Sequence, residues 1–202
     1  MIFITAYCQI NDDHCTANGN LLLKNEGETS WPRSLYNYAK LDYPKFHKMD
    51  MMAKMGTIGV EFLKLQNENL NRYADDSIAL VFANKNSSAN TDLKFQASYQ
   101  ERKSPSPSLF VYTLPNILLG EIAIKNKWYG ENIFTISNQF DPAFFENYSK
   151  TLIPTKAQAC ICGWINVFKN SIDGFLFSLE QEDSTGLNLP LTTNNLLNLR
   201  KA

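Results

Sequence analysis

The chain lacks an excess of charge of either sign, and it has no long basic run. Its 19 lysine and arginine residues nearly balance 20 aspartate and glutamate residues, which gives a formal net charge of −1. No basic cluster is longer than the pair Arg102-Lys103. Because polyanions are bound by clustered positive charge, we expect no nucleic-acid partner.

Long apolar runs are also missing. A helix that crosses a membrane needs about 20 apolar residues, and no run in this sequence reaches about 18. Residues 1–8 are apolar, but they have neither a basic n-region nor a small-residue cleavage site. We therefore expect an opening strand, no membrane span and a cytoplasmic protein.

Cysteine is scarce, with four residues in the chain. Cys160 and Cys162 are separated by one residue, so they should point to the same face of a strand. A closed zinc site needs four ligands, which favours buried structural cysteines over a metal or redox pair. Cys8 and Cys15 could pair in principle, although a reducing cytosol disfavours a disulfide. The sequence predicts no metal and no cofactor.

The pattern of apolar residues predicts one α/β domain. Helices are expected from Met51 to Leu65, from Pro115 to Lys125 and from Asp141-Pro142 to Leu152, with Asp50 as an N-cap. Strands separated by helices favour a three-layer α-β-α arrangement around a mixed sheet. The strands are expected at 1–8, 77–83, 133–137, 158–164 and 174–180.

The remaining segments are predicted to be irregular. Residues 11–31 are expected as a polar loop, and residues 84–107 mainly as a surface loop in which Leu93, Phe95 and Tyr99 could anchor a short helix. Gly120 lies inside a predicted helix, where glycine usually indicates close packing against a neighbour. We divide the chain into a domain at 1–180 and a polar C-terminal tail at 181–202 that docks loosely.

A set of short motifs occurs in a fixed order along the chain. Gly120 and Gly130 are ten residues apart, and Gln139 follows nine residues after Gly130. Over about residues 1–180 the motifs resemble the N-terminal half of β-ketoacyl synthases, which have the thiolase-like fold. They are Lys48-Met49-Asp50, Ser106-Pro107, Pro115-Asn116-x3-Gly120, Gly130-x-Asn132 and Cys162-Gly163.

Gln139 stands where this resemblance implies a nucleophilic cysteine. A ketosynthase needs a thiolate to hold the acyl chain and two histidines, which the family supplies from its C-terminal half. That half is missing from this chain, apart from a strand at 174–180, and the only histidines, His14 and His47, match neither catalytic position. We interpret the chain as a protein without catalytic residues.

Glutamine at this position resembles the chain-length factors, which are inactive subunits of type II polyketide synthases. The resemblance implies a heterodimer with a full-length β-ketoacyl synthase and access to acyl carrier protein through that complex. The single-half form also resembles short ketosynthase-like proteins of aryl polyene and flexirubin pigment systems. A homodimer in the absence of the partner stays open, as does the role of Gln139 beyond satisfying backbone groups at a helix start.

The same resemblance implies two segments at the partner interface. The strand at 133–137 would pair with its counterpart across a twofold or pseudo-twofold axis, because an apolar edge should be covered. The segment after Ser106-Pro107 would either pack the interface or reach the partner's acyl tunnel and limit chain length. The residues concerned are Ile133, Phe134, Thr135 and Ile136 in the strand and Leu109, Phe110 and Tyr112 in the segment.

Two other functions are carried as alternatives. One is a residual enzyme, either a malonyl-carrier-protein decarboxylase or an acyl transferase. The other is a stand-alone scaffold that binds an acyl chain or a carrier protein.

Overall fold

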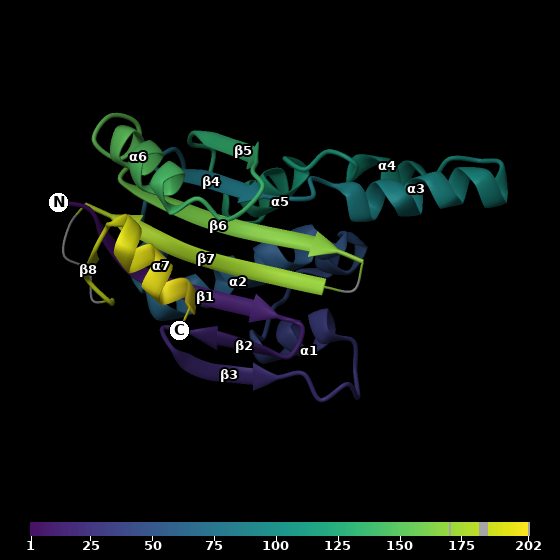
Figure 1. Ribbon diagram of the computed structural model, residues 1–202, viewed down its shortest axis with the longest axis horizontal. Helices are drawn as coiled ribbons and strands as arrows, with labels where there is room; N and C mark the ends of the chain where they lie inside the picture. Colours follow the sequence, from purple (N-terminus) through teal and green to yellow (C-terminus); the bar gives the residue numbers. More distant parts are fainter. Residues whose placement is uncertain (170, 182–185, 202) are drawn as a thin grey trace.

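A single mixed sheet forms the centre of the molecule (Figure 1). The computed structural model describes residues 1–169, 171–181 and 186–201, and in this part of the chain the strand order is β3-β2-β1-β7-β6-β4-β5, with β8 paired to β1. β4 runs parallel to β5 and to β6, and the other neighbours are antiparallel. The strands are β1 (Phe3–Asn11), β2 (His14–Ala17), β3 (Asn20–Lys24), β4 (Ile78–Asn84), β5 (Asn132–Ile136), β6 (Ala159–Phe168), β7 (Ser171–Glu180) and β8 (Leu189–Pro190).

Helices cover both faces of this sheet (Figure 1). α6 and α7 lie on one face, and α1, α2 and α5 lie on the other, so the predicted three-layer α-β-α class is confirmed. Within the described residues, no helix is long and apolar enough to cross a bilayer. The helices are α1 (Trp31–Tyr38), α2 (Met51–Gln66), α3 (Ala89–Arg102), α4 (Pro107–Val111), α5 (Ile117–Asn126), α6 (Pro142–Leu152) and α7 (Thr193–Lys201), with short 3-10 turns η1 (Pro44–Lys48) and η2 (Glu68–Asn71).

The strand β4 explains why there are two hydrophobic clusters. All its residues are buried, and successive side chains point to opposite faces. Leu80 and Phe82 join the cluster under α2, whereas Ala79 and Val81 join the cluster under α6. Burial of each large apolar side chain contributes about 1.5–3 kcal/mol, so both faces stabilise the sheet.

The helix α2 begins and packs as its sequence predicts. The Asp50 carboxylate accepts a hydrogen bond from the Ala53 N–H at 2.8 Å, which caps the first turn. Farther along, a Cβ on Gly59 would lie 2.5 Å from Cδ1 of Leu176. The glycine therefore lets α2 approach β7 closely.

The predicted polar loop at 11–31 is wrong. Residues 14–24 form the hairpin β2–β3, whose turn has Asn18 at φ 46° and Gly19 at φ 79°. Positive φ at both positions is what a two-residue hairpin turn requires, and Asn-Gly supplies it. The Asn18-Gly19 dipeptide is therefore the local signal for this hairpin.

Residues 84–107 are also more regular than predicted. A continuous helix, α3, spans residues 89–102. Together, α3 and α4 extend beyond the end of the sheet (Figure 1). We call residues 89–111 the arm. Its inner side carries Phe95, whose ring lies 5.6 Å from the ring of Phe110 in α4, so a tertiary contact supports the polar helix.

The C-terminal segment is packed on the body, whereas the sequence suggested loose docking. Leu196 of α7 is fully buried. The Thr193 hydroxyl donates to Oε2 of Glu146 in α6 at 2.6 Å, and the Gln9 side chain donates to the Leu199 carbonyl at 2.6 Å. Residues 182–185 and 202 of the predicted tail lie outside the described residues, and the domain division at residue 180 stays a prediction.

Candidate functional site

Gln139 lies in the turn between β5 and α6, and its side chain is exposed. The residue that caps α6 is Asp141, whose Oδ1 accepts hydrogen bonds from the N–H groups of Ala143 at 3.0 Å and Phe144 at 3.2 Å. The Ser137 hydroxyl donates to the Gln139 carbonyl at 2.9 Å. The helix start is therefore satisfied by Asp141, and the Gln139 amide is not needed for capping.

A hollow of about 500 Å³, the Gln139 hollow, opens beside this turn between β1, β7 and the end of α7. One wall is an ion pair in which Nη2 of Arg200 lies 2.9 and 2.7 Å from the two oxygens of Asp173. The guanidinium also lies 5.0 Å from the ring centre of Phe140. The residues that line the hollow are Gln9, Ile10, Asn11, Gln139, Phe140, Asp173, Gly174, Leu197, Arg200 and Lys201.

The residues of this hollow cannot perform thiol chemistry. The lining contains no cysteine and no histidine. Cys160 and Cys162 are buried and free, and burial raises the pKa of both thiols, that of Cys160 to about 12. The prediction that they are buried structural cysteines is confirmed, because a neutral buried thiol is a poor nucleophile.

The two histidines have structural surroundings. Nε2 of His14 lies 3.3 Å from the side-chain nitrogen of Asn11. The His47 ring packs 4.8 Å from Tyr36 and 5.7 Å from Phe46. Neither ring lines the Gln139 hollow, so neither is placed to act as a base there.

The strand just before Gln139 forms one edge of the sheet. β5 pairs with β4 alone in the described part of the chain. Ile133 and Phe134 pack partly against the two cores, Thr135 is half-buried, and Ile136 is 54% exposed. The outer backbone groups of β5 are therefore free to pair with another strand.

The arm presents the second predicted interface segment. Phe110 is 59% exposed, Leu109 is half-buried and Val111 is exposed. Tyr112 differs from them, because its side chain is buried and its hydroxyl donates to Oε1 of Glu121 at 2.9 Å. The interface roles of all these residues stay predictions, and Tyr112 lies at the base of the arm.

The helix α5 buries charged side chains beside apolar ones, and it exposes Ile124 on its outer side. Glu121 and Lys125 are 5% and 12% exposed at their side chains, whereas Ile124 is 56% exposed. Ile117 and Gly120 lie on the same side as Ile124 at helical spacing. The prediction of close packing at Gly120 is wrong within this chain, because a Cβ there would have no atom within 4 Å.

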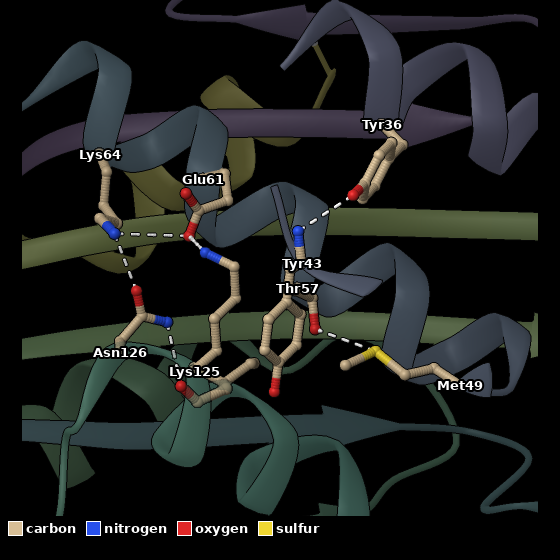
Figure 2. Close-up of polar contacts among 9 residues, drawn as sticks. Tyr36, Tyr43, Met49, Thr57, Glu61, Lys64, Lys125 and Asn126 are labelled. Carbon is tan, nitrogen blue, oxygen red and sulfur yellow. Dashed lines mark hydrogen bonds and ion pairs between the residues drawn. The ribbon is translucent and has the colours of Figure 1, made fainter. Parts of the chain in front are cut away.

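Ion pairs fix the inner side of α5 to α2 (Figure 2). Glu61 of α2 lies 2.6 Å from Nζ of Lys125 and 3.4 Å from Nζ of Lys64. Lys64 also donates to the Asn126 side chain at 2.8 Å, and burial lowers the pKa of its ammonium. This network holds α5 in an orientation in which Ile124 faces outward.

Exposed large apolar side chains are concentrated in the stretch of the sequence that contains the arm, α5 and β5. Thirteen of them are exposed in the described residues, and eight lie between residues 93 and 136. The sequence analysis missed the contribution of α5, although the spacing of Ile117, Gly120 and Ile124 could have indicated it. The eight are Leu93, Tyr99, Phe110, Val111, Leu114, Ile124, Tyr129 and Ile136.

No protein-family model matches the chain, and no curated protein matches it by sequence. Solved structures do match. A ketosynthase in complex with its chain length factor from Xenorhabdus doucetiae aligns with a TM-score of 0.55 and 16% identity, over 80% of this chain and 73% of the matched chain.

Two further structures give higher TM-scores. The ishigamide ketosynthase/chain length factor aligns with a TM-score of 0.67 at 15% identity and covers 93% of this chain. A type II polyketide synthase acyl-carrier protein in complex with its ketosynthase, bound to the hexaketide, aligns with a TM-score of 0.66 at 12% identity and covers 89%. The chain spans 64% and 62% of the length of these two matched chains. The chain therefore has the thiolase-like fold of the solved ketosynthases and ketosynthase–chain length factor complexes.

Proposed function

We propose that this chain is a non-catalytic, chain-length-factor-like subunit that pairs with an active β-ketoacyl synthase. The observation that carries the proposal is the free, apolar edge of β5, which lies between the outer side of α5 and the turn that holds Gln139. The partner binds this edge and extends the sheet across the interface. Acyl carrier protein contacts this chain when it binds the complex with the ketosynthase.

The edge of β5 favours a protein partner because it has none of the features that protect a free edge. Proteins that stay monomeric usually block such edges with charge, proline or a bulge. Residues 132–136 contain no charged residue and no proline, and their pairing with β4 is regular. The exposed apolar side chains of the arm and of α5 continue the same surface, as is typical of interaction sites.

The absence of catalysis is proposed from the chemistry of the position. Gln139 stands where the resemblance implies a thiolate, and an amide forms no thioester with an acyl chain. The lining of the Gln139 hollow contains no cysteine and no histidine, and its Asp173 carboxylate is ion-paired with Arg200. This composition supports a binding role over a residual decarboxylase or transferase.

The proposal also concerns the class of acyl chain that the complex makes. The solved complexes that share the fold include a chain length factor and a ketosynthase that holds a hexaketide. By analogy, the partner extends a polyene, fatty-acyl or polyketide chain, and Leu109 and Phe110 of the arm meet its acyl tunnel. Bulk at these two positions limits the chain length, because each added methylene must displace a packed side chain at a cost of about 1 kcal/mol or more.

Two experiments test the proposal. The chain is co-expressed with a full-length ketosynthase from the same locus, and the expected result is a stable one-to-one complex that makes acyl products of defined length. The isolated chain is also incubated with malonyl carrier protein and followed by mass spectrometry. Turnover or an acyl adduct on the isolated chain would favour a residual enzyme, and a homodimer that captures carrier protein without a ketosynthase would favour a scaffold.

A further inference from the structure

The base of the arm contains a buried carboxylate that the proposed interface does not itself require. Glu121 lies on the inner side of α5, where the residue is 4% exposed. A buried charge destabilises a protein unless it is paired and hydrogen-bonded. An apolar residue would serve packing alone, so the presence of glutamate calls for a role that its contacts can explain.

The contacts of Glu121 join α5 to the end of α4 and to η1, which is distant in the sequence. Its Oε1 accepts the hydroxyl of Tyr112 at 2.9 Å, and its Oε2 lies 2.7 Å from Nζ of Lys45 in η1. Tyr112 is the residue that follows α4, where the exposed arm enters the body of the protein. Burial, reinforced by the hydrogen bond to Glu121, raises the pKa of the Tyr112 phenol, so the hydroxyl remains a donor.

The other end of the arm is fixed at the same base. The Ser88 hydroxyl, directly before α3, donates to the Thr113 carbonyl at 2.6 Å. In the first turn of α3, the Thr91 hydroxyl donates to Oδ2 of Asp50 at 2.7 Å. Both ends of the arm are therefore held, and the contact between Phe95 and Phe110 joins its two helices.

We propose that Glu121 is a positioning residue that holds Tyr112 and thereby sets where Leu109 and Phe110 meet the partner. This inference rests on the proposed function, because only in that complex do the two side chains reach an acyl tunnel. Leu109 and Phe110 lie in α4, three and two residues before Tyr112, which is the C-cap of this short helix. A change in the orientation of Tyr112 at the end of α4 therefore moves the side chains of Leu109 and Phe110.

Hydrogen exchange on the isolated chain tests the positioning directly. Tyr112→Phe keeps the ring and removes the hydroxyl, so amides of residues 107–113 should exchange roughly tenfold faster or more, while those of α2 and β6 keep their rates. Glu121→Gln keeps an oxygen acceptor but loses the ion pair with Lys45, and it should give a smaller increase in the same segment. Tyr38→Phe, at a 43% exposed tyrosine in α1 and outside the arm, is the matched control and should exchange like the wild type.

The reconstituted complex supplies the second readout. With the Tyr112→Phe chain, the ketosynthase should release products of broader length distribution, whereas the Tyr38→Phe chain should give the wild-type distribution. If the amides of residues 107–113 exchange at the wild-type rate in both Tyr112→Phe and Glu121→Gln, the inference is overturned. Faster exchange throughout the chain also overturns it, as does a local change that leaves the product distribution unaltered. A wild-type chain that binds no ketosynthase would refute the proposed function, and the exchange rates would still decide whether Glu121 holds the arm.

Discussion

Replacing Gly120 with alanine should have opposite effects on the isolated chain and on the proposed complex. Gly120 lies in the interior of α5, and a Cβ at this position has no atom within 4 Å. Alanine is more favourable than glycine in a helix by about 1 kcal/mol. Because no clash offsets this gain, the free energy of unfolding of the isolated chain should rise by about that amount.

The isolated chain is assayed by urea and thermal unfolding. For a chain of this size, about 1 kcal/mol corresponds to a rise in the melting temperature of about 2–4 °C. Gly59→Ala is the matched control, because it gains the same helix propensity but places its Cβ 2.5 and 2.8 Å from the two Cδ atoms of Leu176. That variant should be less stable than the wild type by about 1–3 kcal/mol.

In the complex, the same methyl group of Gly120→Ala meets whatever packs on the outer side of α5. An overpacked contact costs about 1–3 kcal/mol, which lowers the affinity for the ketosynthase roughly fivefold to a hundredfold. If the isolated Gly120→Ala chain is less stable than the wild type, the space around a Cβ atom at position 120 is not open. A more stable chain with unchanged affinity would show that α5 lies outside the interface.

Three further predictions concern the fold that carries the interface. Gly130→Ala should destabilise the chain by about 2 kcal/mol or more in urea unfolding, because its Cβ would lie 2.5 and 2.7 Å from the backbone carbonyls of Ile78 and Asp76. Leu196→Ala should cost about 2–5 kcal/mol in the same assay, since this side chain is fully buried, and a loss below 1 kcal/mol would mean that α7 is loosely attached. Hydrogen bonds from Lys150 and Thr193 lower the pKa of Glu146, so the stability this carboxylate adds is present above its ordinary pKa of 4.5 and is lost as the pH falls. The deficit of Glu146→Gln in melting temperature should accordingly shrink below about pH 4.5, and a pH-independent deficit would contradict this reasoning.

The central elements of the fold could be predicted because their signals are local or strongly periodic. The run at 78–83 is continuously apolar, and it lies in the strand β4, which is buried on both faces. Asp50 and Asp141 precede their helices by one residue, and both accept hydrogen bonds from the first turn. The fold class followed from the order of these elements.

The hairpin β2–β3 was missed although its Asn-Gly turn is a local signal, whereas the two helices that the sequence described poorly depend on contacts distant in the sequence. α3 is polar along most of its length, and its tertiary anchors are Phe110 and Asp50, which no local pattern reveals. α7 is held by Glu146 and Asp173, again from other elements.

The candidate site was predicted to a similar degree. The sequence located the edge strand and the exposed part of the arm. It did not predict that Tyr112 points inward, because that orientation depends on Glu121. It also did not predict the outer side of α5, because α5 has apolar side chains on both sides, and its charged residues Glu121 and Lys125 are buried through ion pairs with residues far away in the sequence.

The most direct test of the proposed pairing is a charge placed on the free edge of β5. Ile136→Lys puts a lysine on the edge at a side chain that is 54% exposed, and Leu65→Lys makes the same change at a 61% exposed side chain in α2. Each variant is co-expressed with the ketosynthase of the same locus, and native mass spectrometry measures the fraction of one-to-one complex. The account predicts that wild type and Leu65→Lys form the complex and that Ile136→Lys does not. An Ile136→Lys chain that assembles as fully as the wild type would contradict the claim that β5 is the partner interface.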